Sequence, residues 1–142
     1  MSTGPAAGDS WSLLLNALRN LRTGWPARGW SWDTRFNCVT SSFNVEMEAK
    51  ARSTVAAVLT TEWTSVTIGS ASPALRDLAE RTGGLRAGQL IFASPTVGTS
   101  FSYGLWWPWG DAITTSLRIG LAGASVREDT LKRLRDVFGV EP

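Results

Sequence analysis

The sequence contains no histidine, one cysteine and only two lysines among its 142 residues. Histidine is the commonest general base and the commonest metal ligand. Its absence therefore excludes Ser-His-Asp and Cys-His catalysis and histidine-based metal sites. Because Cys38 is the single cysteine, neither an internal disulfide nor a cysteine-cluster metal site can form within one chain. We expect no metal and no cofactor, and binding becomes a better hypothesis than catalysis.

Long apolar runs and blocks of like charge are also missing. No run of about 18 apolar residues occurs, so the sequence predicts no transmembrane helix. The first residues lack the basic and apolar regions of a secretory signal, and we expect a cytoplasmic protein. Basic and acidic residues number 14 and 12, for a net charge of +2, and no like-charged tail is present. We therefore expect no nucleic-acid partner.

Length and composition indicate one folded domain. Hydrophobic residues make up 43% of the chain and charged residues 18%, which is apolar enough for a core and too weakly charged for a disordered chain. Residues 1–8 are small and glycine-containing, so we interpret them as a flexible lead. Residues 9–142 contain no linker, repeat or low-complexity stretch and are predicted to form a single domain.

The first segment with helical periodicity covers residues 11–22. Asp9 or Ser10 is a suitable N-cap, and Gly24 lies just past the predicted end. The residues that share its apolar face are Trp11, Leu14, Leu15, Leu18 and Leu21. Such an amphipathic helix can pack on a sheet, on a partner or on a membrane surface.

Two further helices are predicted from their end signals. One lies within residues 72–84, where a Ser-Pro pair opens it and a Gly-Gly pair ends it. The other lies within residues 125–139, where Ser125 and Glu128 form a capping box and Gly139 ends the helix. Their inward residues are predicted to be Leu75, Leu78 and Ala79 in the first, and Leu131, Leu134, Val137 and Phe138 in the second.

Alternation of apolar and polar residues predicts the strands. The segments are residues 43–50, one long or two short strands within 53–68, a buried strand at 89–94, and a hairpin of 101–107 with 113–121. Hairpin connections dominate and no repeated strand-helix-strand unit occurs. The predicted fold is α+β, with a single antiparallel sheet of about five to six strands and an N-terminal, a middle and a C-terminal helix on one side of it.

Residues that could carry catalysis form no recognisable site. Glu46 and Glu48 share one face of the predicted strand with other polar residues, which is typical of a solvated face. Cys38 has no histidine partner and is interpreted as an inert thiol. The glycines at 83–88 lack the lysine and the spacing of a phosphate-binding loop. We therefore predict that the protein is not an enzyme.

Eight tryptophans are the distinctive feature of the composition. Three of them fall within residues 24–34, which are predicted to be an irregular loop with aromatic contacts. The segment 101–109, FSYGLWWPW, contains three more. Trp106 and Trp107 are adjacent, so on a strand their side chains must point to opposite faces. Either apolar surface remains outside the core, or a further element covers the second face.

Tryptophan and tyrosine anchor many protein interfaces and membrane surfaces. The candidate interaction surface consists of Tyr103, Trp106, Trp107, Trp109 and Arg118 on the hairpin and of Trp11, Leu14 and Leu18 on the first helix. The leading hypothesis is a non-enzymatic protein–protein interaction module of the adaptor, chaperone-like or oligomerisation type, which binds a protein partner or self-associates as a homo-oligomer.

Two alternatives use the same residues. The hairpin and the amphipathic helix could associate with a membrane surface, because Arg19 and Arg22 lie on the polar side of that helix. A pocket lined by tryptophan could instead bind a small ligand or support a reaction. This third hypothesis requires convergent polar groups that the sequence does not reveal.

Overall fold

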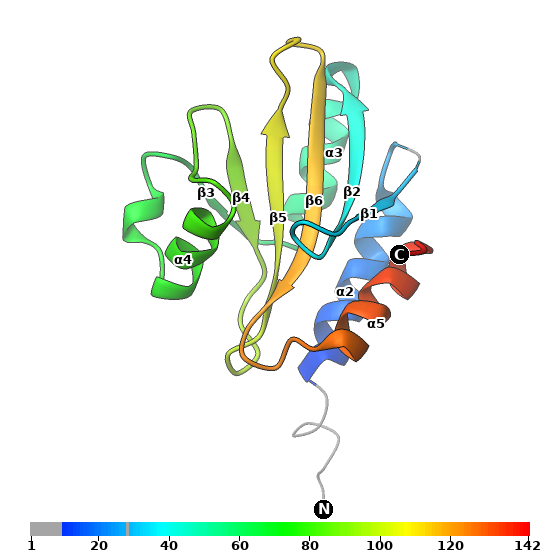
Figure 1. Ribbon diagram of the computed structural model, residues 1–142. Coiled ribbons are helices and arrows are strands. Elements are labelled where there is room, and N and C mark those ends of the chain that lie inside the picture. Colours follow the sequence, from blue (N-terminus) through cyan, green and yellow to red (C-terminus); the bar gives the residue numbers. More distant parts are fainter. Residues whose placement is uncertain (1–9, 28) are drawn as a thin grey trace, which may run out of the picture.

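The computed structural model describes residues 10–27 and 29–142, so the predicted flexible lead at 1–8 lies outside the described residues. It forms one antiparallel sheet in the order β1-β2-β6-β5-β4-β3 (Figure 1). The strands are β1 Ser31–Asp33, β2 Cys38–Asn44, β3 Thr61–Trp63, β4 Leu90–Ala93, β5 Phe101–Pro108 and β6 Thr114–Ala122. The helices are α2 Ser10–Gly24, α3 Glu48–Ala56, α4 Pro73–Arg81 and α5 Glu128–Phe138, with 3-10 turns η1 Val45–Met47 and η2 Ile68–Ser70. The α+β fold is confirmed.

Helices cover both faces of the sheet. The closed face, as we name it, carries Phe92, Trp106 and Ile119 and is covered by α2, α3 and α5. The open face carries Ile91 and Leu105 and is covered only in part, by α4, which lies beside β4 in Figure 1. The expectation that all helices lie on one side was wrong. The reason is that β5 is buried throughout residues 101–106, so both of its faces need a cover.

The closed face holds the larger core. The indole ring of Trp106 contacts the rings of Phe43 and Phe92, at centroid distances of 5.1 and 5.7 Å. Helices α2 and α5 run side by side over it (Figure 1). The predicted inward residues of α2, α4 and α5 are all buried, so those helical patterns are confirmed. The periodicity of apolar residues alone therefore predicts which side chains of these three helices face the core.

The strand predicted at 43–50 was wrong. Only Phe43 and Asn44 extend β2, after which the chain turns through η1 into α3. The side chain of Asn44 accepts a hydrogen bond from the Glu46 amide and so caps this turn. In α3, Ala51 and Val55 are four residues apart and both buried, which is a helical spacing. The alternating pattern of residues 43–50 therefore runs into the start of a helix, and the strand prediction for 53–68 survives only as β3.

The segment predicted to be an irregular loop, residues 24–34, also contains the short edge strand β1. Its tryptophans do make aromatic contacts: Trp25 and Trp30 pack at 5.3 Å, and Trp30 lies 4.5 Å from Phe138 of α5. The start of α5 differs from the prediction as well. Its N-cap is Arg127, whose amide donates to the Thr130 hydroxyl, rather than a box begun at Ser125. A Ser125–Ser100 hydrogen bond of 3.1 Å competes for that side chain.

Candidate functional site

Five of the predicted interaction residues are buried inside the fold. Trp11, Leu14 and Leu18 are at most 6% exposed because α5 of the same chain covers the apolar face of α2. Trp106 lies in the closed-face core, and Tyr103 is 4% exposed on the open face. The expectation that these side chains form an exposed surface is therefore corrected. The apolar face of α2 is not available to a partner or to a membrane in the folded chain.

Trp107 and Arg118 come together on the open face. The Arg118 guanidinium lies 4.5 Å from the centre of the Trp107 ring, and its Nε donates to Asp33 Oδ2 at 3.2 Å. A second nitrogen, Nη1, donates to Ser116 Oγ at 2.8 Å. Phe36 meets the same indole edge to face at 5.8 Å. The loop between β1 and β2 thus folds back over β6, as Figure 1 shows, and holds Trp107 half-buried.

Trp109 remains exposed at the end of the hairpin. The described residues include six large hydrophobic side chains that are exposed, and four of them lie at this end of the sheet: Trp109, Ile113, Val45 and Met47. We name these four residues the tip surface. The Val45 amide donates to the Ile113 carbonyl at 2.8 Å, which holds the turn after β2 against the hairpin. The β5–β6 hairpin extends beyond its neighbours in Figure 1, so the tip is accessible.

The hairpin turn is built around Asp111. Its carboxylate accepts hydrogen bonds from the amides of Ile113 and Thr114 and from the Thr114 hydroxyl. These bonds lower the pKa of Asp111 below its ordinary value, so the tip carries a negative charge. Ala112 sits at a φ of 64°, in the left-handed region that this tight turn requires. Glu46 adds a second exposed carboxylate beside Val45 and Met47.

A cleft opens on the open face, between the C-terminal end of α4 and the β1–β2 loop. It consists of three adjoining hollows that share Phe36 and Arg81, and the largest of the three measures about 440 Å³. The residues that line it come from three segments of the chain. They are Arg35, Phe36 and Asn37 from the loop, Arg81, Thr82 and Arg86 from α4 and the turn after it, and Tyr103 and Trp107 from β5. Asn37 has a φ of 53°, a conformation that asparagine tolerates well and that closes the loop over the sheet.

Three arginines give the cleft its charge, and none of the described residues that line it is acidic. Arg35 lies 4.3 Å above the Phe36 ring, and neither Arg35 nor Arg86 forms an ion pair with a described residue. Cations without carboxylate partners beside aromatic rings favour an anion.

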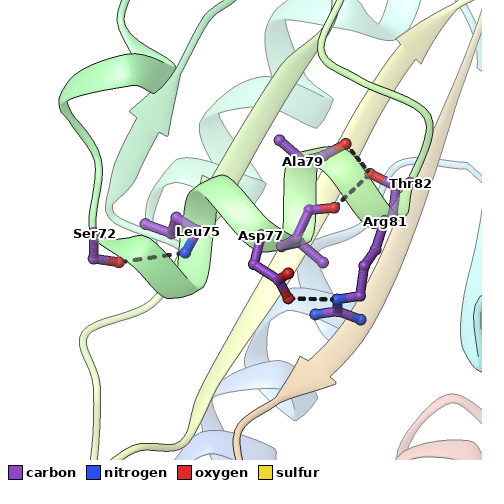
Figure 2. A network of polar contacts seen from close by, with 7 residues as sticks. Ser72, Leu75, Asp77, Ala79, Arg81 and Thr82 are labelled. Atoms are coloured by element: carbon purple, nitrogen blue, oxygen red, sulfur yellow. Dashed lines mark hydrogen bonds and ion pairs between the residues drawn. The ribbon is translucent and has the colours of Figure 1, made fainter.

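The end of α4 fixes the third arginine. Arg81 Nε donates to Asp77 Oδ2 at 2.8 Å, one turn back (Figure 2). The Thr82 hydroxyl donates to the carbonyls of Leu78 and Ala79 and ends the helix. At the other end, Ser72 accepts from the Leu75 amide, so the predicted cap is confirmed. Asp77 thus neutralises part of the Arg81 charge, and the hydrogen bond occupies only the Nε of the guanidinium.

Tyr103 forms part of the buried floor of the cleft. Its ring lies across Gly120 of β6, and a Cβ added at Gly120 would be only 2.3 Å from the Tyr103 hydroxyl oxygen. That hydroxyl makes no hydrogen bond to any residue between 10 and 142 that the structure describes. It is not among the fully buried side-chain atoms without a partner, so the oxygen opens onto the cleft. Burial is the largest cause that raises the pKa of Tyr103 well above its ordinary value, so the group keeps its proton.

The cysteine and the two glutamates that could carry catalysis do not form a site with one another. Cys38 is fully buried, and burial together with the Asp33 charge raises the pKa of its thiol to about 12. Glu46 is exposed in η1 and Glu48 begins α3, so they do not share a strand face. Within the described part of the chain, no group of His, Cys, Asp or Glu residues is arranged to hold a metal. None of the helices in that part could cross a bilayer.

Sequence reasoning missed the arginines of the cleft. Arg35 and Arg86 lie in turns, where periodicity carries no information, and Arg81 follows Asp77 by four residues, a spacing typical of an exposed ion pair on a helix. One signal was present: Arg35 and Arg86 have no acidic residue three or four positions away in the chain. Comparison with known proteins adds nothing to this, since no family model, curated protein or solved structure matches the chain.

Proposed function

We propose that the protein is a non-enzymatic interaction module that inserts its tip surface into an apolar site on another protein, where basic groups surround that site. The proposal rests on the gathering of Trp109, Ile113, Val45 and Met47 at one end of the sheet. Exposed aromatic and aliphatic side chains that gather in this way are typical of interface anchors.

Charge around the tip surface determines the kind of partner. Glu46 and Asp111 are exposed between the apolar residues, and residues 44–49 and 108–115 contain no basic residue. An anionic membrane would repel this rim, which argues against the membrane hypothesis. Two tips packed against each other in a symmetric dimer would place like charges together. A different protein with a basic rim fits better than either.

The test is photo-crosslinking in the native lysate, with a benzophenone amino acid at position 109 and, as a control, at position 66. Val66 is 89% exposed, away from the tip, so it matches Trp109 as an exposed apolar side chain. We expect a specific product from position 109 alone. Ile113→Ser and Glu46→Lys should abolish it, while Val66→Ser leaves it intact.

Stability measurements keep this test interpretable. Ile113→Ser and Val66→Ser should each change the free energy of unfolding by no more than about 0.5 kcal/mol, because both side chains are exposed. Light scattering should show a monomer at all concentrations. The same products from positions 109 and 66, or none from either, would refute the proposal, as would a dimer that Glu46→Lys stabilises.

A further inference from the structure

We propose that the cleft between α4 and the β1–β2 loop is a second binding site, for a small molecule that carries a phosphate group next to a planar ring. This site is independent of the tip surface. It uses Arg35, Arg81 and Arg86 for the anion, and Tyr103 for both the ring and the anion.

The lining of the cleft is positively charged. Two guanidinium groups without carboxylate partners approach the cleft from opposite walls, Arg35 from the β1–β2 loop and Arg86 from the turn after α4. Arg81 adds two terminal nitrogens that Asp77 leaves unpaired. The planar fork of arginine matches a phosphate in two parallel hydrogen bonds. Three such forks around one hollow fit a doubly charged group better than a single carboxylate.

The Tyr103 hydroxyl lies at the floor of the same cleft. Tyr103 is only 4% exposed, and its hydroxyl has no hydrogen-bond partner among the described residues. The hydroxyl oxygen is not among the fully buried side-chain atoms that lack a partner, so it opens onto the cleft, where a ligand oxygen can accept its proton. A proton that stays on this oxygen at neutral pH is available for a ligand anion.

The size of the cleft also fits a small molecule. The largest hollow, about 440 Å³, lies at the lower end of the range for small-molecule sites, and it continues into its two neighbours. Aromatic side chains at Phe36, Tyr103 and Trp107 provide the apolar lining that a planar ring prefers. Inorganic phosphate would leave this lining in water, and a ring without phosphate would leave the arginines unpaired.

Calorimetry on the whole chain with four probes tests the proposal: adenosine 5′-monophosphate, phenyl phosphate, adenosine and inorganic phosphate. We expect one or both of the first two to bind at least about tenfold more tightly than either of the last two. The tighter of the two phosphate esters then distinguishes a nucleotide from an aryl phosphate. Equal binding of inorganic phosphate, or no binding of either ester at millimolar concentration, would overturn the proposal.

Variants locate the site. Arg35→Gln and Arg86→Gln should each weaken ester binding by about tenfold. Arg76→Gln is the matched control, because Arg76 lies on α4 outside the cleft and loses the same charge. Tyr103→Phe keeps the ring and removes only the hydroxyl, and we expect a loss of about fivefold with no loss of stability. Equal affinities for Arg86→Gln and Arg76→Gln would show that the cleft is not the site.

Discussion

The two faces of the sheet differ in how completely helices cover them, and the neighbouring residues Trp106 and Trp107 show the difference. Trp106 points into the closed face, under three helices, and is 2% exposed. Trp107 points to the open face, where a short helix and a loop leave it half-buried between Arg118 and Phe36. A complete cover gives an apolar core without access. A partial cover leaves a cleft in which charged and aromatic groups meet.

The largest expected effect is on the closed face. Trp106→Ala should lower the free energy of unfolding by about 3–5 kcal/mol, because the missing indole leaves a cavity among Phe43 and Phe92. Trp107→Ala should cost only about 1–2 kcal/mol, since water already reaches that ring. Urea unfolding of both variants measures the difference. Equal losses would mean that the faces are equally closed.

The next effect tests the floor of the open face. Gly120→Ala would place a methyl group on the Tyr103 hydroxyl, and the ring must then swing into the cleft. We expect a loss of about 1–3 kcal/mol in stability and a block of ligand binding. Gly69→Ala is the control, because a Cβ there meets nothing within 4 Å. A Gly120→Ala protein with unchanged stability would show that the ring does not lie across β6.

Alkaline pH tests the burial of Cys38 beneath the open face. The folded thiol has its pKa raised from 9.0 to about 12, so below pH 9 it is protonated in both states and contributes no pH dependence. Between pH 9 and 12 the unfolded chain releases this proton and the folded chain does not, so stability falls, by up to about 1.4 kcal/mol per pH unit. Unfolding as a function of pH should be shallower in Cys38→Ala. Identical slopes would contradict the burial.

The smallest effect concerns the rim of the cleft. Asp77→Asn should change stability by about 0.5 kcal/mol or less, because both members of its ion pair with Arg81 are more than half exposed. It should nevertheless strengthen phosphate-ester binding, since Arg81 is then free to face the ligand. Calorimetry at low salt checks this. Weaker binding would mean that Asp77 is needed to position Arg81.

The sequence predicted those elements whose signals are local. Leu131, Leu134 and Val137 recur at helical spacing, and Ser72 and Gly139 mark helix ends. The prediction failed at residues 43–50, where an alternating pattern runs into an Ala-containing helix. The cleft was unpredictable because its parts come from a loop, a helix end and a strand that lie about 20 to 70 residues apart in the chain, and no local pattern reports which loop folds over which strand.

By itself the sequence determined that the chain has no histidine chemistry and no internal disulfide, that it forms an antiparallel sheet with three amphipathic helices, and that Trp106 and Trp107 face opposite ways. Neighbouring side chains of a strand point to opposite faces of the sheet, so the positions of two residues in the chain determine whether they share a face. Only the tertiary structure decided which face of the sheet is covered by helices. That coverage depends on where α2, α4 and α5 pack, and their packing depends on contacts between segments that are distant in the chain. For this reason the tryptophan excess is core at Trp106, cleft wall at Trp107 and exposed tip at Trp109.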